Sequence, residues 1–187
     1  MPDLISPAGG DIGLQRRSDG SYASLVTGGA YRTTATITRP SNATAYTAGD
    51  VVGDTGGSAI ISLTAAGPTA GFVIIQSASL VFSDSTVPSG MGAFRLHLFS
   101  TSPTATADNA PFDLTSADRA TYMGYVDFSS PQDLGSTIYT QTDYPGRLIK
   151  LAAASTTLFV ELETRGAYTP VSASTVSIRM NLLEAGL

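Results

Sequence analysis

The sequence predicts an all-β fold: an antiparallel β-sandwich, jelly-roll-like, with about ten strands, one short helix and an extended N-terminal arm. Short segments that alternate apolar and polar residues recur from Tyr31 to the C-terminus. Turns rich in Gly, Pro, Asp and Asn separate these segments, and the chain has no strand–helix–strand spacing. Eight or more strands of this kind favour a jelly roll over a smaller barrel.

Length and composition indicate one domain with a weakly charged surface. A chain of 187 residues can bury roughly 70% of its unfolded surface, so it needs no disulfide or metal to fold. Charged residues make up 13% of the chain, against about 25% in typical proteins. Much of the surface must therefore be Ser, Thr, Gly and Asn. Such a surface suits a subunit of an assembly, and many Ser/Thr-rich extracellular β-proteins share it.

Residues 1–30 are predicted to form an extended arm, and residues 31–187 the β-sandwich domain. The arm is rich in Gly, Ser and Ala, and its one strand-like segment is Tyr22–Val26. Such an arm can gain order by adding a strand to a neighbouring subunit's sheet edge, and the alternative is a disordered terminus. The first residues lack the pattern of a signal peptide, and no apolar run reaches the ~20 residues of a membrane span. We expect a soluble protein that the Sec route does not export.

The first strands of the sandwich are defined by β-branched residues and by turns. Tyr31–Thr38 alternates, and Pro40 ends it because proline has no N–H to donate to a ladder. Phe72–Ser83 is the longest apolar stretch, and its β-branched residues favour one long buried strand over a helix. Further strands in this half are predicted at Val51-Val52, Ala59–Leu63 and Ala93–Phe99.

The second half of the chain begins with the predicted helix, Leu114–Tyr122. Thr115 or Ser116 can cap its N-terminus, and Asp118 lies in the first turn, where the helix dipole favours negative charge. Strands then follow at Met123–Phe128, Thr137–Thr142, Leu148–Leu151, Thr157–Glu163 and Thr175–Leu183. In three of the predicted strands the alternation predicts which side chains face the core. They are Phe94, Leu96 and Leu98 in the first, Leu158, Val160 and Leu162 in the second, and Val176, Ile178, Met180 and Leu182 in the third.

His97 is the single imidazole of the chain and lies mid-strand on the polar face beside Arg95. It cannot build a multi-His metal site, and no nucleophile or HExxH pattern surrounds it. We therefore expect a surface or interface histidine. The adjoining loop Ser100–Asp113 is long for a sandwich, and loops of this length are usually functional or interfacial.

Acidic residues offer two further chemical hypotheses. Glu161 and Glu163 project from one strand face as a glycosidase pair might, although such pairs normally face each other across a cleft with aromatic platforms. A second set could bind Ca²⁺ but matches no EF-hand spacing, so loop acids and a helix cap are expected: Asp108, Asn109, Asp113, Asp118, Asp127 and Asp133. Arg39, Asp50 and Asp54 are better explained by loop chemistry and a surface ion pair. We expect no catalytic, cofactor-binding or metal-binding residues, and no enzyme.

Nucleic acid is excluded as a partner by charge. The net charge is −5, and ten basic residues give no continuous positive track for a phosphate backbone. Gly53, Gly56 and Gly57 form no phosphate loop, because no Lys-Ser/Thr pair and no helix follow them.

Three segments carry a resemblance: Ile37–Asp54 (ITRPSNATAYTAGDVVGD), Val87–Phe99 (VPSGMGAFRLHLF) and Asn109–Tyr139, which begins NAPFDLTSADRATYMGYVDF. Together they resemble a family of structural proteins encoded in tailed-bacteriophage genomes, from about residue 35 to the C-terminus. The resemblance implies a β-sandwich virion component, specifically a capsid decoration or cement protein on the head surface. It carries over no catalytic residues.

The resulting hypothesis is a homo-oligomer, a dimer or trimer, that binds the assembled major capsid protein and reinforces it. It is made in the host cytoplasm and resides on the capsid surface of the virion, and residues 1–30 reach into a neighbouring subunit. The alternative is a tail- or fibre-associated protein that binds host glycans through Tyr144, Tyr168 and Asp143. A glycan hydrolase that uses Glu161 or Glu163 is the weakest hypothesis.

Overall fold

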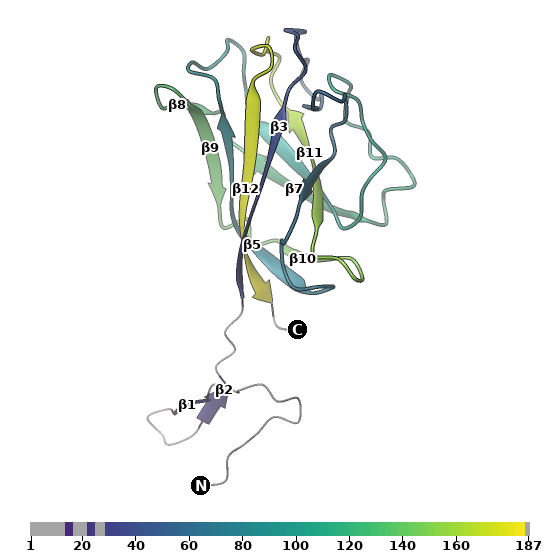
Figure 1. Cartoon of the computed structure of the whole chain (residues 1–187), viewed down its shortest axis with the longest axis vertical. Coiled ribbons are helices and arrows are strands. Elements are labelled where there is room, and N and C mark those ends of the chain that lie inside the picture. The colour runs from purple at the N-terminus through teal and green to yellow at the C-terminus, as the bar shows by residue number, and fades with distance from the viewer. Residues whose placement is uncertain (1–13, 17–21, 25–28, 186–187) are drawn as a thin grey trace.

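The computed structural model describes residues 14–16, 22–24 and 29–185 (Figure 1). These ranges contain twelve strands and no helix. The strands are β1 (Leu14–Arg16), β2 (Tyr22–Ser24), β3 (Ala30–Thr38), β4 (Ile61–Leu63), β5 (Phe72–Phe82), β6 (Phe94–Phe99), β7 (Tyr122–Phe128), β8 (Gln132–Asp133), β9 (Ile138–Asp143), β10 (Leu148–Lys150), β11 (Leu158–Thr164) and β12 (Thr175–Ala185).

Strands β3 to β12 form two antiparallel sheets. The large sheet has the order β3-β12-β5-β9-β8, with β10 paired to β5, and the small sheet has the order β4-β11-β6-β7. Apart from the short β8 and β10, the strands pair as β3 with β12, β4 with β11, β5 with β9 and β6 with β7. Among these eight strands, the first thus pairs with the last, the second with the second last, and so on to the middle two. This is the pairing of one long β-hairpin that is folded over to form two sheets. This is a jelly-roll topology, and the predicted fold class is confirmed.

The core lies between the two sheets and is built from the predicted alternation. All of the side chains that alternation directed inward on β6, β11 and β12 are buried. Phe82 of the large sheet meets Phe94 of the small sheet with ring centroids 5.3 Å apart. Apolar faces on both sheets therefore hold the sandwich together.

The helix predicted at Leu114–Tyr122 is wrong, because the segment forms turns that lead into β7. The N–H of Asp118 donates to the carbonyl of Thr115 (3.2 Å), and the N–H of Tyr122 donates to the carbonyl of Asp118 (3.0 Å). The Asp118 carboxylate also accepts a bond from the N–H of Thr104, which ties the turn to the preceding loop. A segment of about two turns is too short to form a helix without tertiary support.

The long loop after β6 folds back over the outer face of the small sheet. Residues 106–112 lie beside residues 49–59, where the N–H of Asn109 donates to the carbonyl of Val51 (3.0 Å). The N–H of Val51 in turn donates to the carbonyl of Ala110 (2.9 Å). The predicted strand Val51-Val52 is thus reduced to one isolated bridge, between Val51 and Glu163 of β11, and the neighbouring Asp50 bridges to Pro111 of this loop.

The two ends of the sandwich differ. At the terminal end, β3 begins and β12 ends side by side, with Ala30 paired to Leu183 (Figure 1). The loop end, at the top of Figure 1, is formed by residues 39–60, 83–93, 129–137 and 165–174. There the backbones of Gly92 and Gly166 approach so closely that a Cβ on Gly166 would lie 2.5 Å from the nitrogen of Gly92.

Strands β1 and β2 pair with each other, and β2 falls within the predicted strand Tyr22–Val26. The rest of the predicted arm before Gly29 lies outside the described residues, so the domain boundary at residue 30 stays a prediction. None of the described segments forms a helix long and apolar enough to cross a membrane.

Candidate functional site

The outer face of the small sheet carries a polar cluster centred on His97 of β6. The Nε2 atom of His97 lies 3.0 Å from Oε2 of Glu163, and its Nδ1 atom lies 3.0 Å from the hydroxyl oxygen of Tyr122. The ring of Phe112 stacks on the imidazole with centroids 3.5 Å apart. His97 is therefore only 3% exposed. His97 was predicted to be a surface or interface histidine, but it is buried within the chain itself, because Phe112 belongs to a loop that returns over the sheet.

The groups of this cluster satisfy one another. Burial lowers the pKa of His97, because the imidazolium loses its hydration, and the nearby Glu163 carboxylate acts in the opposite direction. Arg165 donates to the other oxygen of Glu163 at 2.8 Å. The imidazole and the carboxylate thus form a buried structural network beneath the loop, and the exposed guanidinium of Arg165 joins it from the surface.

Glu161 and Glu163 project from one face of β11, as predicted, but both are buried. Glu161 pairs with His97 across the strands and accepts a weak bond from the N–H of Thr106 at 3.4 Å. Burial raises the pKa of Glu161, and that bond partly counters the effect. The two carboxylates lie under the loop after β6 and do not face each other across a cleft, as a glycosidase pair would.

A second polar cluster joins the loop end to the loop after β6. The Nε of buried Arg39 donates to the hydroxyl of Tyr46 at 2.6 Å, and that hydroxyl donates to Asp108 at 2.7 Å. A second guanidinium nitrogen of Arg39 lies 3.8 Å from Asp108, which also accepts a bond from the N–H of Gly53 (2.8 Å). Burial raises the pKa of Tyr46. Arg39 was predicted in a surface ion pair, and this is wrong because the loops close over it.

The acidic residues considered as Ca²⁺ ligands instead form ion pairs and hydrogen bonds in separate parts of the protein. Asp127 makes a bidentate pair with Arg95 at 2.7 and 3.2 Å, and Asp133 accepts from the N–H of Gly135 in a turn. Asp118 bonds to its own loop, and the hydroxyl of Thr115 lowers its pKa. Among the described residues, no three His, Asp or Glu side chains gather to hold a metal ion.

The residues of the glycan hypothesis do not come together. Tyr168 is buried at the loop end, where its ring packs against that of Tyr46 with centroids 5.4 Å apart. Tyr144 is 79% exposed and follows Asp143 near the terminal end. The three residues therefore form no common sugar platform.

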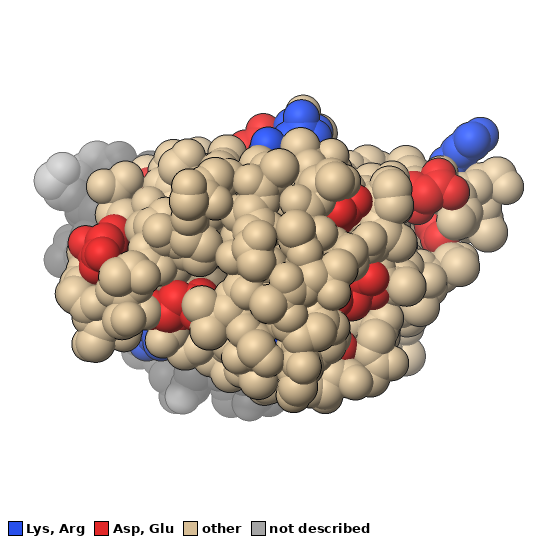
Figure 2. Space-filling view, turned by 90° about the horizontal axis from the view of Figure 1, so that it is seen from above, with Lys and Arg blue, Asp and Glu red and all other residues tan. Residues whose placement is uncertain are grey.

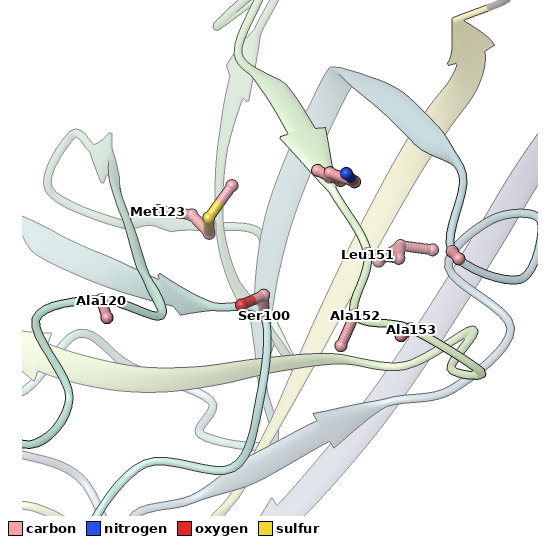
Figure 3. Close-up of a pocket in the computed structure, with 8 residues that line it drawn as sticks. Ser100, Ala120, Met123, Leu151, Ala152 and Ala153 are labelled. Carbon is pink, nitrogen blue, oxygen red and sulfur yellow. The ribbon is translucent and has the colours of Figure 1, made fainter.

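A shallow hollow of about 480 Å³ lies between β10 and the loop that joins β6 to β7 (Figure 3). Four alanines, Leu151 and Met123 make most of its wall, and Ser100 and Lys150 add polar atoms. Lys150 is the one charged side chain of the lining.

The outer face of the large sheet has Ser, Thr and Asn in its upper rows. The hydroxyls of Thr36 and Ser177 lie 2.7 Å apart across the strands, and Asn181 donates to Ser77 at 2.8 Å. Nearer the terminal end, three apolar residues on adjacent strands form what we call the apolar row: Leu183, Ile74 and Leu148.

The loop end presents a second weakly charged surface. Figure 2, which views the molecule from this end, shows mostly uncharged residues with scattered acidic groups and few basic ones. Leu134 and Val171 belong to its loops and are 64% and 52% exposed. Alternation locates strands but not exposed loop residues, so the sequence did not single these two out.

Comparison with known proteins gives weak likenesses only. No protein-family model and no curated protein sequence matches the chain. A chain from Cocksfoot mottle virus is 12% identical with a TM-score of 0.30, over 84% of this chain and 96% of that one. A chain from Desmodium yellow mottle tymovirus is 12% identical with a TM-score of 0.28, over 100% and 96%.

The insecticidal delta-endotoxin Cry8Ea1 from Bacillus thuringiensis is also 12% identical, with a TM-score of 0.28. The match covers 76% of this chain and only 19% of the toxin chain. Similarity at these TM-scores carries no argument about function.

Proposed function

We propose that this protein is a non-enzymatic structural subunit of a tailed-bacteriophage virion. It binds the assembled major capsid protein on the head surface and reinforces the shell as a decoration or cement protein. It is made in the host cytoplasm and acts as a homo-oligomer, a dimer or trimer. The observation that carries this proposal is that His97 and Arg39 are held inside the fold by their neighbours, while the loop end and the outer face of the large sheet are exposed and weakly charged. In the described part of the chain, the buried side-chain atoms without a hydrogen bond are Nη2 of Arg39 and Oδ1 of Asn109.

The clusters support a passive role. His97 and Arg39 are held by hydrogen bonds to their own neighbours, so they stabilise loops and present no reactive group. A binding subunit needs instead a rigid scaffold and contact area of the order of 800 Å² per partner. Jelly rolls are used in viral capsids, and also in lectins and cupins, so the fold is compatible with this role without deciding it. The three resembling segments favour the virion.

The loop end is the surface that we assign to the capsid. Leu134 and Val171 are large, exposed and apolar, and side chains of this kind supply contact area where a partner covers them. Binding to the assembled shell alone then stabilises it by mass action without any chemistry. Residues 1–30 are proposed to reach into a neighbouring subunit from the opposite end.

Binding to particles tests this proposal. Purified protein added to phage particles that lack it should appear by cryo-electron microscopy at regular positions on the head. Leu134→Asp and Val171→Asp should each lower occupancy at least tenfold, whereas Thr34→Asp on the large sheet should bind as the unmodified protein does. Density only at the tail or portal would refute the decoration role and favour the tail- or fibre-associated alternative.

Deletion of residues 2–28 tests the arm. The sandwich begins at Ala30, so the shortened protein should fold and unfold cooperatively, yet fail to bind particles. If the shortened protein occupies the head fully, the arm part of the proposal is wrong while the loop-end part stands.

A further inference from the structure

The apolar row crosses three adjacent strands on the outer face of the large sheet. Leu183 of β12 pairs directly with Ile74 of β5, and Ile74 pairs directly with Leu148 of β10, so the three side chains lie in line. Leu148 is 47% and Leu183 is 40% exposed. Phe72, two residues from Ile74, extends the apolar area toward the terminal end. The Nζ atom of Lys150 lies 5.4 Å from the centroid of the Phe72 ring.

Two opposite charges bracket the row along one side of β5. Because β12 pairs with one side of β5, both β9 and β10 lie on its other side. Lys150 of β10 is two residues beyond Leu148, toward the terminal end. Asp143 of β9 pairs with Ser77, three residues from Ile74 in the other direction. Both charged side chains are exposed and share the outer face with the row.

This arrangement is complementary to itself. At a rise of about 3.3 Å per residue, Lys150 lies roughly 7 Å to one side of the row. Asp143 lies roughly 7–10 Å to the other side, because Ser77 is three residues from Ile74 on β5 while its partner Asn181 is two residues from Leu183 on β12. A two-fold axis that runs across the strands along the row would bring the row of one copy onto that of the next. The same axis would bring Lys150 of each copy opposite Asp143 of its partner. The two residues differ slightly in their distance from the row, and the length of a lysine side chain spans that difference.

We infer that two copies of this chain associate face to face through the apolar row, with two reciprocal Lys150–Asp143 contacts at its flanks. The interface is isologous, because each copy contributes the same residues. A second copy fits better than an unrelated partner, since on the β9 and β10 side of the row one cation and one anion match their own two-fold image. Arg32 of β3 is also exposed on this face, but it lies at the opposite edge of the sheet. The inference deepens the homo-oligomer part of the proposed function and rests on that part alone.

Sedimentation of the full chain over a range of concentrations tests the inference without any phage particle. A monomer–dimer equilibrium is expected, and Leu148→Asp should raise its dissociation constant at least tenfold by placing a carboxylate in the apolar row. Thr36→Asp, exposed on the same face but far from the row, is the matched control and should leave the constant unchanged. A full chain that stays monomeric at several hundred micromolar overturns the inference.

Charge reversal identifies the pairing. Lys150→Asp and Asp143→Lys should each raise the dissociation constant by placing like charges together, and the double variant should restore it to within about threefold. Circular dichroism verifies that all variants are folded. A double variant as weak as the singles shows that the dimer, if present, uses another surface. Particle binding by Leu148→Asp, measured separately, distinguishes failure of the dimer from failure of the capsid role.

Discussion

Single residues in this protein are positioned by burial more than by their local sequence. Arg39 is fully buried, and it is held by Tyr46, Asp108 and the carbonyl of Val171. Each partner comes from a different loop, so this one side chain connects two loops of the loop end with the loop after β6. A buried cation of this kind depends on its counter-ion, because the charge has lost its hydration.

Asp108→Ala should therefore destabilise the fold by about 3–5 kcal/mol, since it leaves the Arg39 guanidinium buried without its carboxylate. Denaturant unfolding measures the change in the free energy of unfolding. Asp127→Ala is the control, because it breaks the exposed pair with Arg95 and should cost about 0–1 kcal/mol. Equal losses in the two variants would contradict the buried role of Asp108.

His97 should make stability depend on pH. Burial lowers its pKa in the folded state, so the unfolded chain binds the proton first as pH falls through ~6.5. Stability should then decrease with acidification, by at most about 1.4 kcal/mol per pH unit. Glu161, with a raised pKa, acts in the opposite sense at lower pH, so the comparison is made with His97→Gln. The variant should lose this slope between pH 7.5 and 5.5, and an unchanged slope would assign it to another group.

At the scale of elements, the loop after β6 acts as a cover for the small sheet. Its main chain bonds to residues 49–59, and Phe112 closes over His97. A loop that is held largely by main-chain bonds near the surface is expected to open locally before the sheets do. The stacked ring opposes this opening together with the main-chain bonds.

Phe112→Ala should destabilise the protein by about 1–2 kcal/mol, because a half-buried ring contributes part of the 1.5–3 kcal/mol of a fully buried one. Hydrogen exchange should quicken at residues 104–112 and stay unchanged in β5 and β12. Phe112→Tyr keeps the stack and should behave like the unmodified protein. If exchange in the loop is unaffected by the alanine variant, main-chain bonds alone hold it.

The strands were predictable from sequence where their side chains alternate. The turn at Leu114–Tyr122 and the burial of polar residues by loops were not. β6, β11 and β12 lie where the pattern placed them, because each buries one face against the opposite sheet. Leu114–Tyr122 has the local features of a helix, but Asp118 bonds to Thr104 instead. His97 and Arg39 were assigned to the surface because segments distant in the sequence cover them. Such long-range coverage has no local signature.

For the whole molecule, the nested pairing makes the last strand essential. β12 lies between β3 and β5 and so completes both of their ladders. A chain that stops after residue 172 leaves β3 without its partner and exposes one side of β5. This chain should show no cooperative unfolding by circular dichroism, whereas the chain without residues 2–28 should. A folded, cooperative product of the C-terminal truncation would mean that β3 and β5 can pair directly.

The direct pairing of Ala30 with Leu183 also makes the sandwich suitable for circular permutation. A short Gly-Ser linker can join these adjacent ends, and the chain can be reopened at Gly135, in the turn between β8 and β9, without breaking any strand. The permutant would keep every ladder while its new termini emerge at the loop end. A fused protein can thus be attached at the terminal end of the original chain or at the loop end of the permutant.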